Sequence, residues 1–181
     1  SHAPSVRQTL QPSELEDRNL YQMLRTLPAW LMAWTCVILV GAGTIMTNNM
    51  GQMVESLSFP SLAAPASLAL FSVAQAGARV ATGAVSEAAL AWDTSICGIP
   101  KGVPRPAFLI AASVAGFLSH VLLAVTTNEV TFVIGAAFAG AAFGMVWPLM
   151  VLIVGEVFGT LHHGANYMFY DGTFLEILPY S

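Results

Sequence analysis

The chain has 181 residues, of which 56% are hydrophobic and only 9% are charged, and its formal net charge at pH 7 is −4. A soluble globular domain carries roughly 25% charged residues, so this chain has too few charges to cover a soluble surface. The negative balance also argues against a nucleic-acid partner, which would require a basic surface. We therefore expect an all-α, polytopic transmembrane helical bundle whose immediate partner is the lipid bilayer.

The first 26 residues are polar and contain a small acidic cluster. Ser13, with Glu16 three positions later, has the spacing of a capping box that would begin a short helix. A solvated linker fits the same residues equally well, and the sequence leaves both interpretations open. In either case we predict a cytoplasmic polar segment at residues 1–26.

Four long apolar runs follow this segment. An α-helix needs about 20 residues to cross a hydrocarbon core about 30 Å thick, and each run is long enough. We predict spans at residues 28–47, 62–85, 107–125 and 130–154. Residues 164–178 are too short and too polar for a fifth span, because acidic residues interrupt them.

The positive charges are distributed unevenly over the connections between these spans. All six Lys and Arg residues fall on one predicted side: Arg7, Arg18, Arg25, Arg79, Lys101 and Arg105. Cytoplasmic loops keep Lys and Arg, whereas translocated loops lose them. This asymmetry predicts a multi-pass integral membrane protein with its N-terminal segment in the cytoplasm, in a membrane that the sequence does not identify.

One cation, Arg79, lies inside an apolar run, where an Arg near the membrane centre costs about 2.5–3.5 kcal/mol on insertion scales. It shares a helix face with Gly83 and Glu87, but Arg79 and Glu87 would rise about 12 Å apart, so each needs a partner elsewhere. Glu156, at the inner end of the fourth run, is a candidate partner for Arg79 or Arg105. Arg79 can act as a snorkelling anchor or in an inter-helix charge relay that closes the cytoplasmic side; we favour the relay.

Small residues recur every four positions in the fourth run, at Ala136, Gly140 and Gly144. Such a face lets helix backbones approach closely in a membrane. Static packing and a moving interface are both compatible with it. Trp147 and Pro148 follow, and Pro148 predicts a bend because it removes a backbone hydrogen bond.

Uncharged polar residues mark two further places. Asn48, Asn49 and Gln52 follow the first run, where they either line an outer vestibule or form a turn that ends the helix. Gln75 lies within the second run, where it either faces a cavity or hydrogen-bonds to a neighbouring helix.

The sequence contains no motif of a catalytic site. It lacks G-x-S-x-G, a Walker loop, H-E-x-x-H and C-x-x-C, so we expect neither an enzyme nor a cofactor. Cys36 and Cys97 give no disulfide framework or metal spacing. His162 and His163 are adjacent and do not share a helix face, so we expect no metal site there.

Four segments resemble, in the same order, the nodulin-like branch of the major facilitator superfamily. They are N-N-M-G-Q with E-S-L from residue 48, G-A-R-V-A-T-G-A-V-S-E from residue 77, P-R-P from residue 104, and F-G-M-V-W-P with G-E-V-F-G from residue 143. The resemblance covers about residues 30–160 and implies a C-terminal-lobe fragment with about four complete spans, helices seven to ten of a twelve-helix fold. It implies a partial transporter lobe at residues 27–160 and a truncated or aberrant tail at residues 161–181.

The resemblance implies a secondary transporter that works by alternating access, in which two lobes rock about a midplane site. Its partners would be the missing N-terminal lobe of a full-length protein and an unknown small solute or ion. Ala88 follows Glu87 where the general facilitator motif has a basic cluster, a departure at the expected gate.

We assign candidate residues to three roles. The gate or charge relay would use Arg79, Glu87, Lys101, Arg105 and Glu156; the pathway would be lined by Asn48, Asn49, Gln52 and Gln75; and helix packing and bending would depend on Gly83, Gly140, Gly144, Trp147 and Pro148. The alternative is a non-transporting membrane subunit or scaffold, which the small-residue faces fit equally well.

Overall fold

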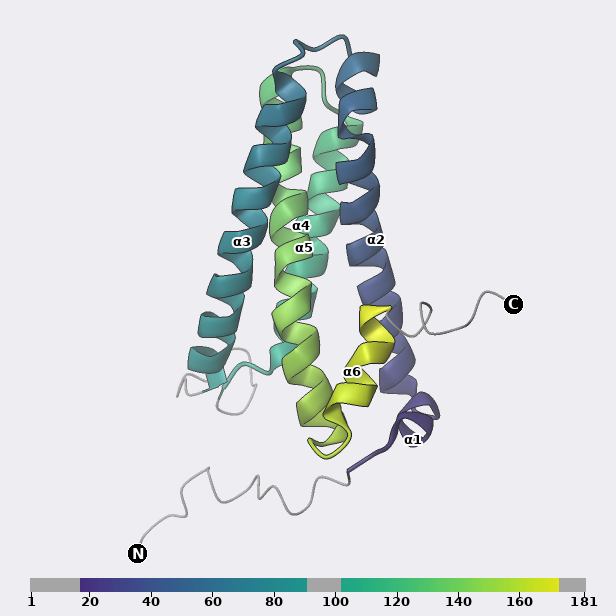
Figure 1. Cartoon of the computed structure of the whole chain (residues 1–181). Helices are drawn as coiled ribbons and strands as arrows, with labels where there is room; N and C mark the ends of the chain where they lie inside the picture. Colours follow the sequence, from purple (N-terminus) through teal and green to yellow (C-terminus); the bar gives the residue numbers. More distant parts are fainter. Residues whose placement is uncertain (1–16, 91–101, 173–181) are drawn as a thin grey trace, which may run out of the picture. The chain divides into compact units, whose positions relative to one another are not determined.

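The computed structural model describes residues 17–90 and 102–172 of the chain. Its elements are the helices α1 (Leu20–Leu24), α2 (Leu27–Ser56), α3 (Ala63–Leu90), α4 (Arg105–Ala124), α5 (Glu129–Phe158) and α6 (His163–Asp171) (Figure 1). No strand occurs in these two ranges. The predicted all-α class is therefore confirmed.

Four of the helices, α2 to α5, are long and apolar enough to cross a membrane. By length and composition the chain is therefore a multi-pass membrane protein. Each helix is longer than the span predicted for it, and α2 ends at Ser56 rather than at residue 47. Its polar end remains helical, and side chains there bond to carbonyls of the preceding turn: Asn49 Nδ2 donates to Ile45 O at 2.7 Å and Thr47 Oγ1 donates to Gly43 O at 3.1 Å.

Contacts divide the chain into two compact units. The larger unit contains residues 34–149, which include α3, α4 and most of α2 and α5. The smaller unit contains the residues before Trp34 and those after Leu149. The two boundaries fall inside α2 and inside α5, and the second lies after Leu149, the residue that follows Pro148.

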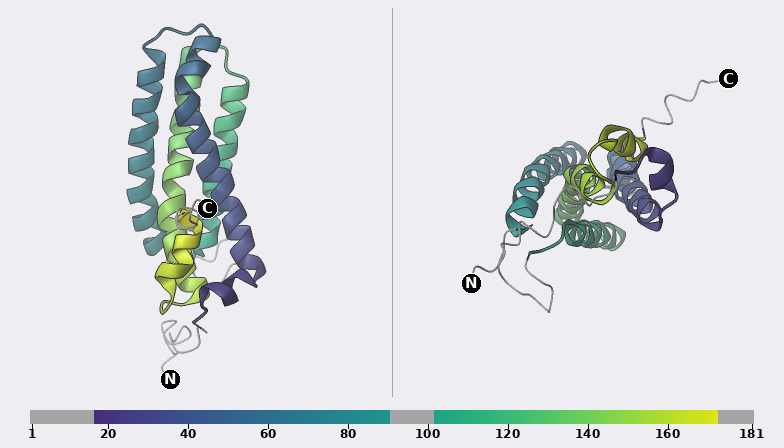
Figure 2. Two further views of the ribbon diagram at one scale, coloured as in Figure 1. Left: turned by 45° about the vertical axis from the view of Figure 1, so that its right-hand side comes forward. Right: turned by 90° about the horizontal axis from the view of Figure 1, so that it is seen from below.

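In the larger unit, α5 contacts all three of the other long helices. Its glycines at 140 and 144 lie against α3, Gly135 lies against Leu123 of α4, and Phe143 lies against Gly43 of α2. Figure 2 shows the same arrangement from below, with α5 between its neighbours. The buried apolar cluster consists of Met46, Met50, Val54, Ala63, Phe71, Phe132, Ala136 and Ala139.

The other faces of this unit are apolar and exposed. Val80 of α3 is 75% exposed, and Ile110 and Phe117 of α4 are each 67% exposed. Exposed apolar patches of this extent are unusual on soluble monomers. Such faces fit a helix bundle that lies in a lipid bilayer.

The smaller unit joins the segment before α2 to the segment after α5. The N–H of Arg18 donates to Phe158 O at 2.9 Å, and Asn166 Nδ2 donates to Arg18 O at 2.8 Å. Tyr170 Oη donates to Ala29 O at 3.2 Å. Residues 163–171, which fall in the segment expected as a truncated or aberrant tail, form α6 with specific bonds to the first described segment.

Helix α1 begins with a capping box that the sequence analysis overlooked. The Asn19 side chain accepts the N–H of Gln22, and the Gln22 side chain accepts the N–H of Asn19, both at 2.9 Å. The Asn-x-x-Gln spacing was a usable signal for it. Ser13 and Glu16, where we considered such a box, lie outside the described residues.

Candidate functional site

The guanidinium group of Arg79 on α3 lies over the indole ring of Trp147 on α5. The distance from Arg79 Cζ to the ring centroid is 5.9 Å, within the range of a cation–π interaction. Arg79 is exposed. A permanently charged group in an apolar helix therefore stays accessible while one aromatic face stabilises it.

The close approach of two helix backbones brings these residues together. A Cβ atom added to Gly140 would lie 2.9 Å from the carbonyl carbon of Phe71, and one added to Gly144 would lie 2.9 Å from the carbonyl carbon of Gln75. The two helices run in the same direction (Figure 1). Contacts repeated every four residues on both helices thus place Arg79 beside the next turn of α5, which contains Trp147.

The Trp147 ring also belongs to a row of aromatic side chains. Phe143 lies 6.2 Å from Trp147 in an edge-to-face arrangement, and Phe71 lies 5.9 Å from Phe143. The indole Nε1 of Trp147 is buried and has no hydrogen-bond partner among the described residues. The ring thus contributes its apolar body and its π face to the site.

Pro148, the next residue, lies inside α5. It has no N–H, so the carbonyl of Gly144 does not receive the usual bond from four residues later. Gly144, one of the two glycines that lie against the α3 backbone, is therefore also a place where the backbone hydrogen bonding of α5 is interrupted. The structure puts the predicted packing and bending residues of α5 in one short segment.

Glu87 and Arg105 form an ion pair between the end of α3 and the first residue of α4. The Arg105 side chain is 7% exposed and the Glu87 side chain is 71% exposed. Val103 also donates its N–H to Ala89 O at 3.0 Å. These bonds tie the two helices together at the end where their connection lies.

Of the other residues predicted for the gate, the structure places Arg79 over Trp147. Arg79 and Glu87 occupy the same helix but have different partners, as their spacing predicted. Lys101 lies outside the described residues. Glu156 is exposed near the end of α5 and belongs to the smaller unit, so its pairing with Arg79 or Arg105 stays a prediction.

The predicted pathway residues lie on two helices. Asn48 and Gln52 are exposed one turn apart on α2, while Asn49 is half-buried and bonded within its helix. Gln75 is half-buried, and its backbone lies against Gly144. The predicted packing residue Gly83 has open space, because an added Cβ would meet nothing within 4 Å.

The site can hold an anionic group at Arg79, but it offers little chemistry beyond binding. Among the described residues no group of three or more His, Cys, Asp or Glu side chains is placed to hold a metal ion. The sequence indicated Arg79 and Trp147 as separate candidates, but not the contact between them. Comparison of the chain with protein-family models, with curated proteins and with solved structures gave no match.

Proposed function

We propose that this chain is part of a secondary transporter of the major facilitator type, in the nodulin-like branch, and that it works by alternating access. The observation that carries the proposal is the exposed guanidinium group of Arg79 over Trp147, directly beside Pro148. Ionisable residues inside membrane spans are costly and typically mark solute or ion pathways.

The depth of Arg79 supports this role. Helix α3 has 28 residues, which at 1.5 Å per residue is about 42 Å and exceeds a hydrocarbon core of about 30 Å. Arg79 precedes the last residue of α3, Leu90, by about 16 Å. With α3 centred in the bilayer, its Cα therefore lies about 10 Å inside the core.

The contact between α3 and α5 provides the moving part in this proposal. No side chain separates the two backbones at Gly140 and Gly144, so the helices can shift without repacking bulky groups. Bending at Pro148 moves Trp147 relative to Arg79 and changes the side from which the guanidinium is accessible. The positive charge favours a solute that carries an anionic group.

The Glu87–Arg105 ion pair holds the adjacent end of α3 in this mechanism. It fixes the end of α3 to α4 while the contact with α5 changes. The pair thus makes α3 and α4 move as one body.

A test of alternating access requires no knowledge of the solute. Cys36 and Cys97 are replaced by Ser, and a single cysteine is introduced by Gln75→Cys in the complete gene product, reconstituted in vesicles. A membrane-impermeant maleimide is then added to either side. We expect labelling at position 75 from both sides, and no labelling from either side for the matched control Val80→Cys, which lies on an exposed apolar face.

Arg79 is then tested in the same background. We expect Arg79→Gln to change the ratio of labelling from the two sides by about threefold or more, whereas Arg79→Lys keeps the charge and changes it less. One-sided labelling at position 75, unaffected by Arg79→Gln in a folded protein, would contradict the proposal. Co-purification with a fixed partner complex in that case would favour the scaffold alternative.

A further inference from the structure

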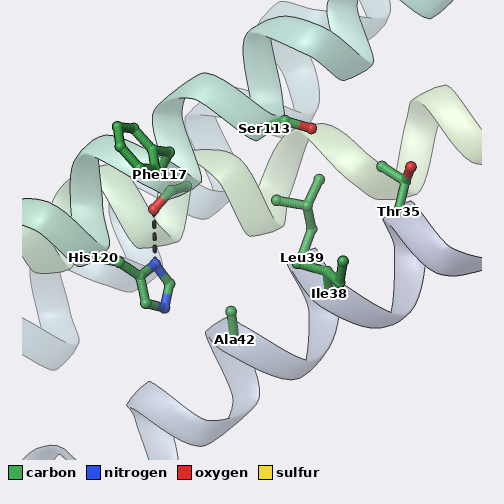
Figure 3. Close-up of a pocket in the computed structure, with 8 residues that line it drawn as sticks. Thr35, Ile38, Leu39, Ala42, Ser113, Phe117 and His120 are labelled. Atoms are coloured by element: carbon green, nitrogen blue, oxygen red, sulfur yellow. Dashed lines mark hydrogen bonds between the residues drawn. The ribbon is translucent and has the colours of Figure 1, made fainter.

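A groove runs between α2 and α4, away from the Arg79 site. It has a volume of about 390 Å³ and is lined mainly by apolar side chains, among them Ile38, Leu39 and Phe117 (Figure 3). A second hollow of about 650 Å³ continues it and shares Ile38, Ala42 and His120. All of these residues belong to the larger unit.

His120 places one hydrogen-bond acceptor in this groove. Its Nδ1 lies 2.7 Å from Gly116 O, as Figure 3 shows. A carbonyl oxygen can only accept, so Nδ1 carries the proton, and in the neutral ring Nε2 is left as an acceptor. The residue is exposed and lines both hollows, so a ligand can reach this atom.

The charge of the groove restricts the ligand. Among the described residues, no Lys, Arg, Asp or Glu lines either hollow. A carboxylate or phosphate would be buried there without a cation, which is strongly unfavourable. A neutral hydroxyl group can instead donate to His120 Nε2.

The order of the lining residues along the helix also restricts the ligand. Helix α4 has 20 residues, about the 30 Å of a hydrocarbon core. His120 lies four residues before its last residue, Ala124, or about 6 Å below that end. Phe117 and Ser113 lie progressively deeper, and the Ser113 hydroxyl already donates to Leu109 O at 2.8 Å.

We propose that this groove binds a sterol-type lipid, with its single hydroxyl group on His120 Nε2 and its rigid apolar body between α2 and α4 toward the membrane centre. A sterol has one hydroxyl group at one end of an otherwise apolar molecule. The groove correspondingly has one acceptor, His120 Nε2, near the end of α4, and apolar side chains below it. Gly116 lines the groove without a side chain. Leu39 lies close to it, since a Cβ atom added to Gly116 would be 3.0 Å from Leu39 Cδ2. An ordinary acyl chain has no donor for His120.

The first experiment locates the lipid. The 181-residue chain is reconstituted in phosphatidylcholine vesicles with a photoactivatable cholesterol analogue, and labelled peptides are identified by mass spectrometry. We expect labelling at residues 35–42 and 113–120 that excess unlabelled cholesterol removes. Ala42→Phe fills the groove and should reduce labelling about fivefold or more, whereas Val73→Phe, on the 68% exposed Val73 of α3, should not.

The second experiment tests the hydroxyl contact. His120→Leu keeps an apolar lining but removes the acceptor, and we expect it to weaken competition by cholesterol about fivefold. Cholestane, which lacks the hydroxyl, should compete equally with the original chain and with His120→Leu. Labelling that spreads evenly over the exposed faces of α3, resists unlabelled cholesterol or persists in Ala42→Phe would overturn the proposal.

Discussion

Gly144 of α5 lies directly against the backbone of Gln75 in α3. A Cβ atom at position 144 would come within 2.9 Å of both the Cα and the carbonyl carbon of Gln75. One turn earlier, Gly140 has the same relationship to Phe71. In a membrane, where lipid tails remove the hydrophobic drive between helices, such backbone contact is a main source of helix association.

Replacement of Gly144 by Ala should therefore destabilise the larger unit. We expect a loss of about 1–3 kcal/mol, because the methyl group forces two backbones apart rather than displacing a flexible side chain. The matched control is Gly83→Ala on α3, where nothing lies within 4 Å. There the better helix propensity of Ala should leave stability equal or raise it by up to about 1 kcal/mol. Reversible unfolding in mixed micelles measures both, and equal effects would contradict the contact.

The ion pair between Glu87 and Arg105 leads to a second prediction. Glu87→Gln should cost about 1–2 kcal/mol, more than Arg105→Gln, because it takes the carboxylate away from the buried Arg105 guanidinium, whereas Arg105→Gln leaves an exposed carboxylate that water can hydrate. The double variant should cost less than the sum of the two single variants. Unfolding of all four proteins at low and high salt gives the coupling energy. Strict additivity would show that the pair adds no stability of its own.

The spans were predictable because apolar content decides which residues can enter a bilayer, whereas the ends of helices depend on something else. The polar residues after residue 47 were expected in a loop, yet they continue α2 as far as Ser56. Polarity ends the hydrophobic run but not the helix, because the helix is held by backbone hydrogen bonds that polar side chains do not interrupt. The end of α2 could therefore not be located from the polarity of the sequence, and only the structure shows it.

The individual residues of the site could be predicted from the sequence, but the contacts between them could not. The sequence pattern indicated Arg79, Trp147 and the two glycines Gly140 and Gly144 of α5. It did not indicate which helices pack against each other. Their relation depends on α3 and α5 running in the same direction, with Phe71 and Gln75 opposite Gly140 and Gly144. The hydrogen bonds between α6 and the first described segment could not be predicted from local sequence patterns either, because they join residues that are far apart in the chain.

Asn166 provides a test of that smaller unit. Its side chain is fully buried and donates to Arg18 O, so Asn166→Ala removes a bond of about 1 kcal/mol and leaves a carbonyl without it. We expect faster amide hydrogen exchange at residues 18–26 and 163–171. The control is His162→Ala, since His162 is exposed and caps α6 without a side-chain bond. Unchanged exchange in Asn166→Ala would mean that the segments are held by other contacts.

Pro148 connects stability with the proposed motion. Pro148→Ala restores an N–H that can donate to the Gly144 carbonyl, and we expect α5 to become more stable by as much as about 3 kcal/mol. If bending there changes access to Arg79, the same variant should reduce the two-sided labelling of a cysteine at position 75. Pro106→Ala is the matched control, because Pro106 lies in the first turn of α4, where proline interrupts no helical bond. A stabilised Pro148→Ala protein with unchanged labelling from both sides would separate the bend from the transport cycle, and the motion would then have to arise at the glycine contact alone.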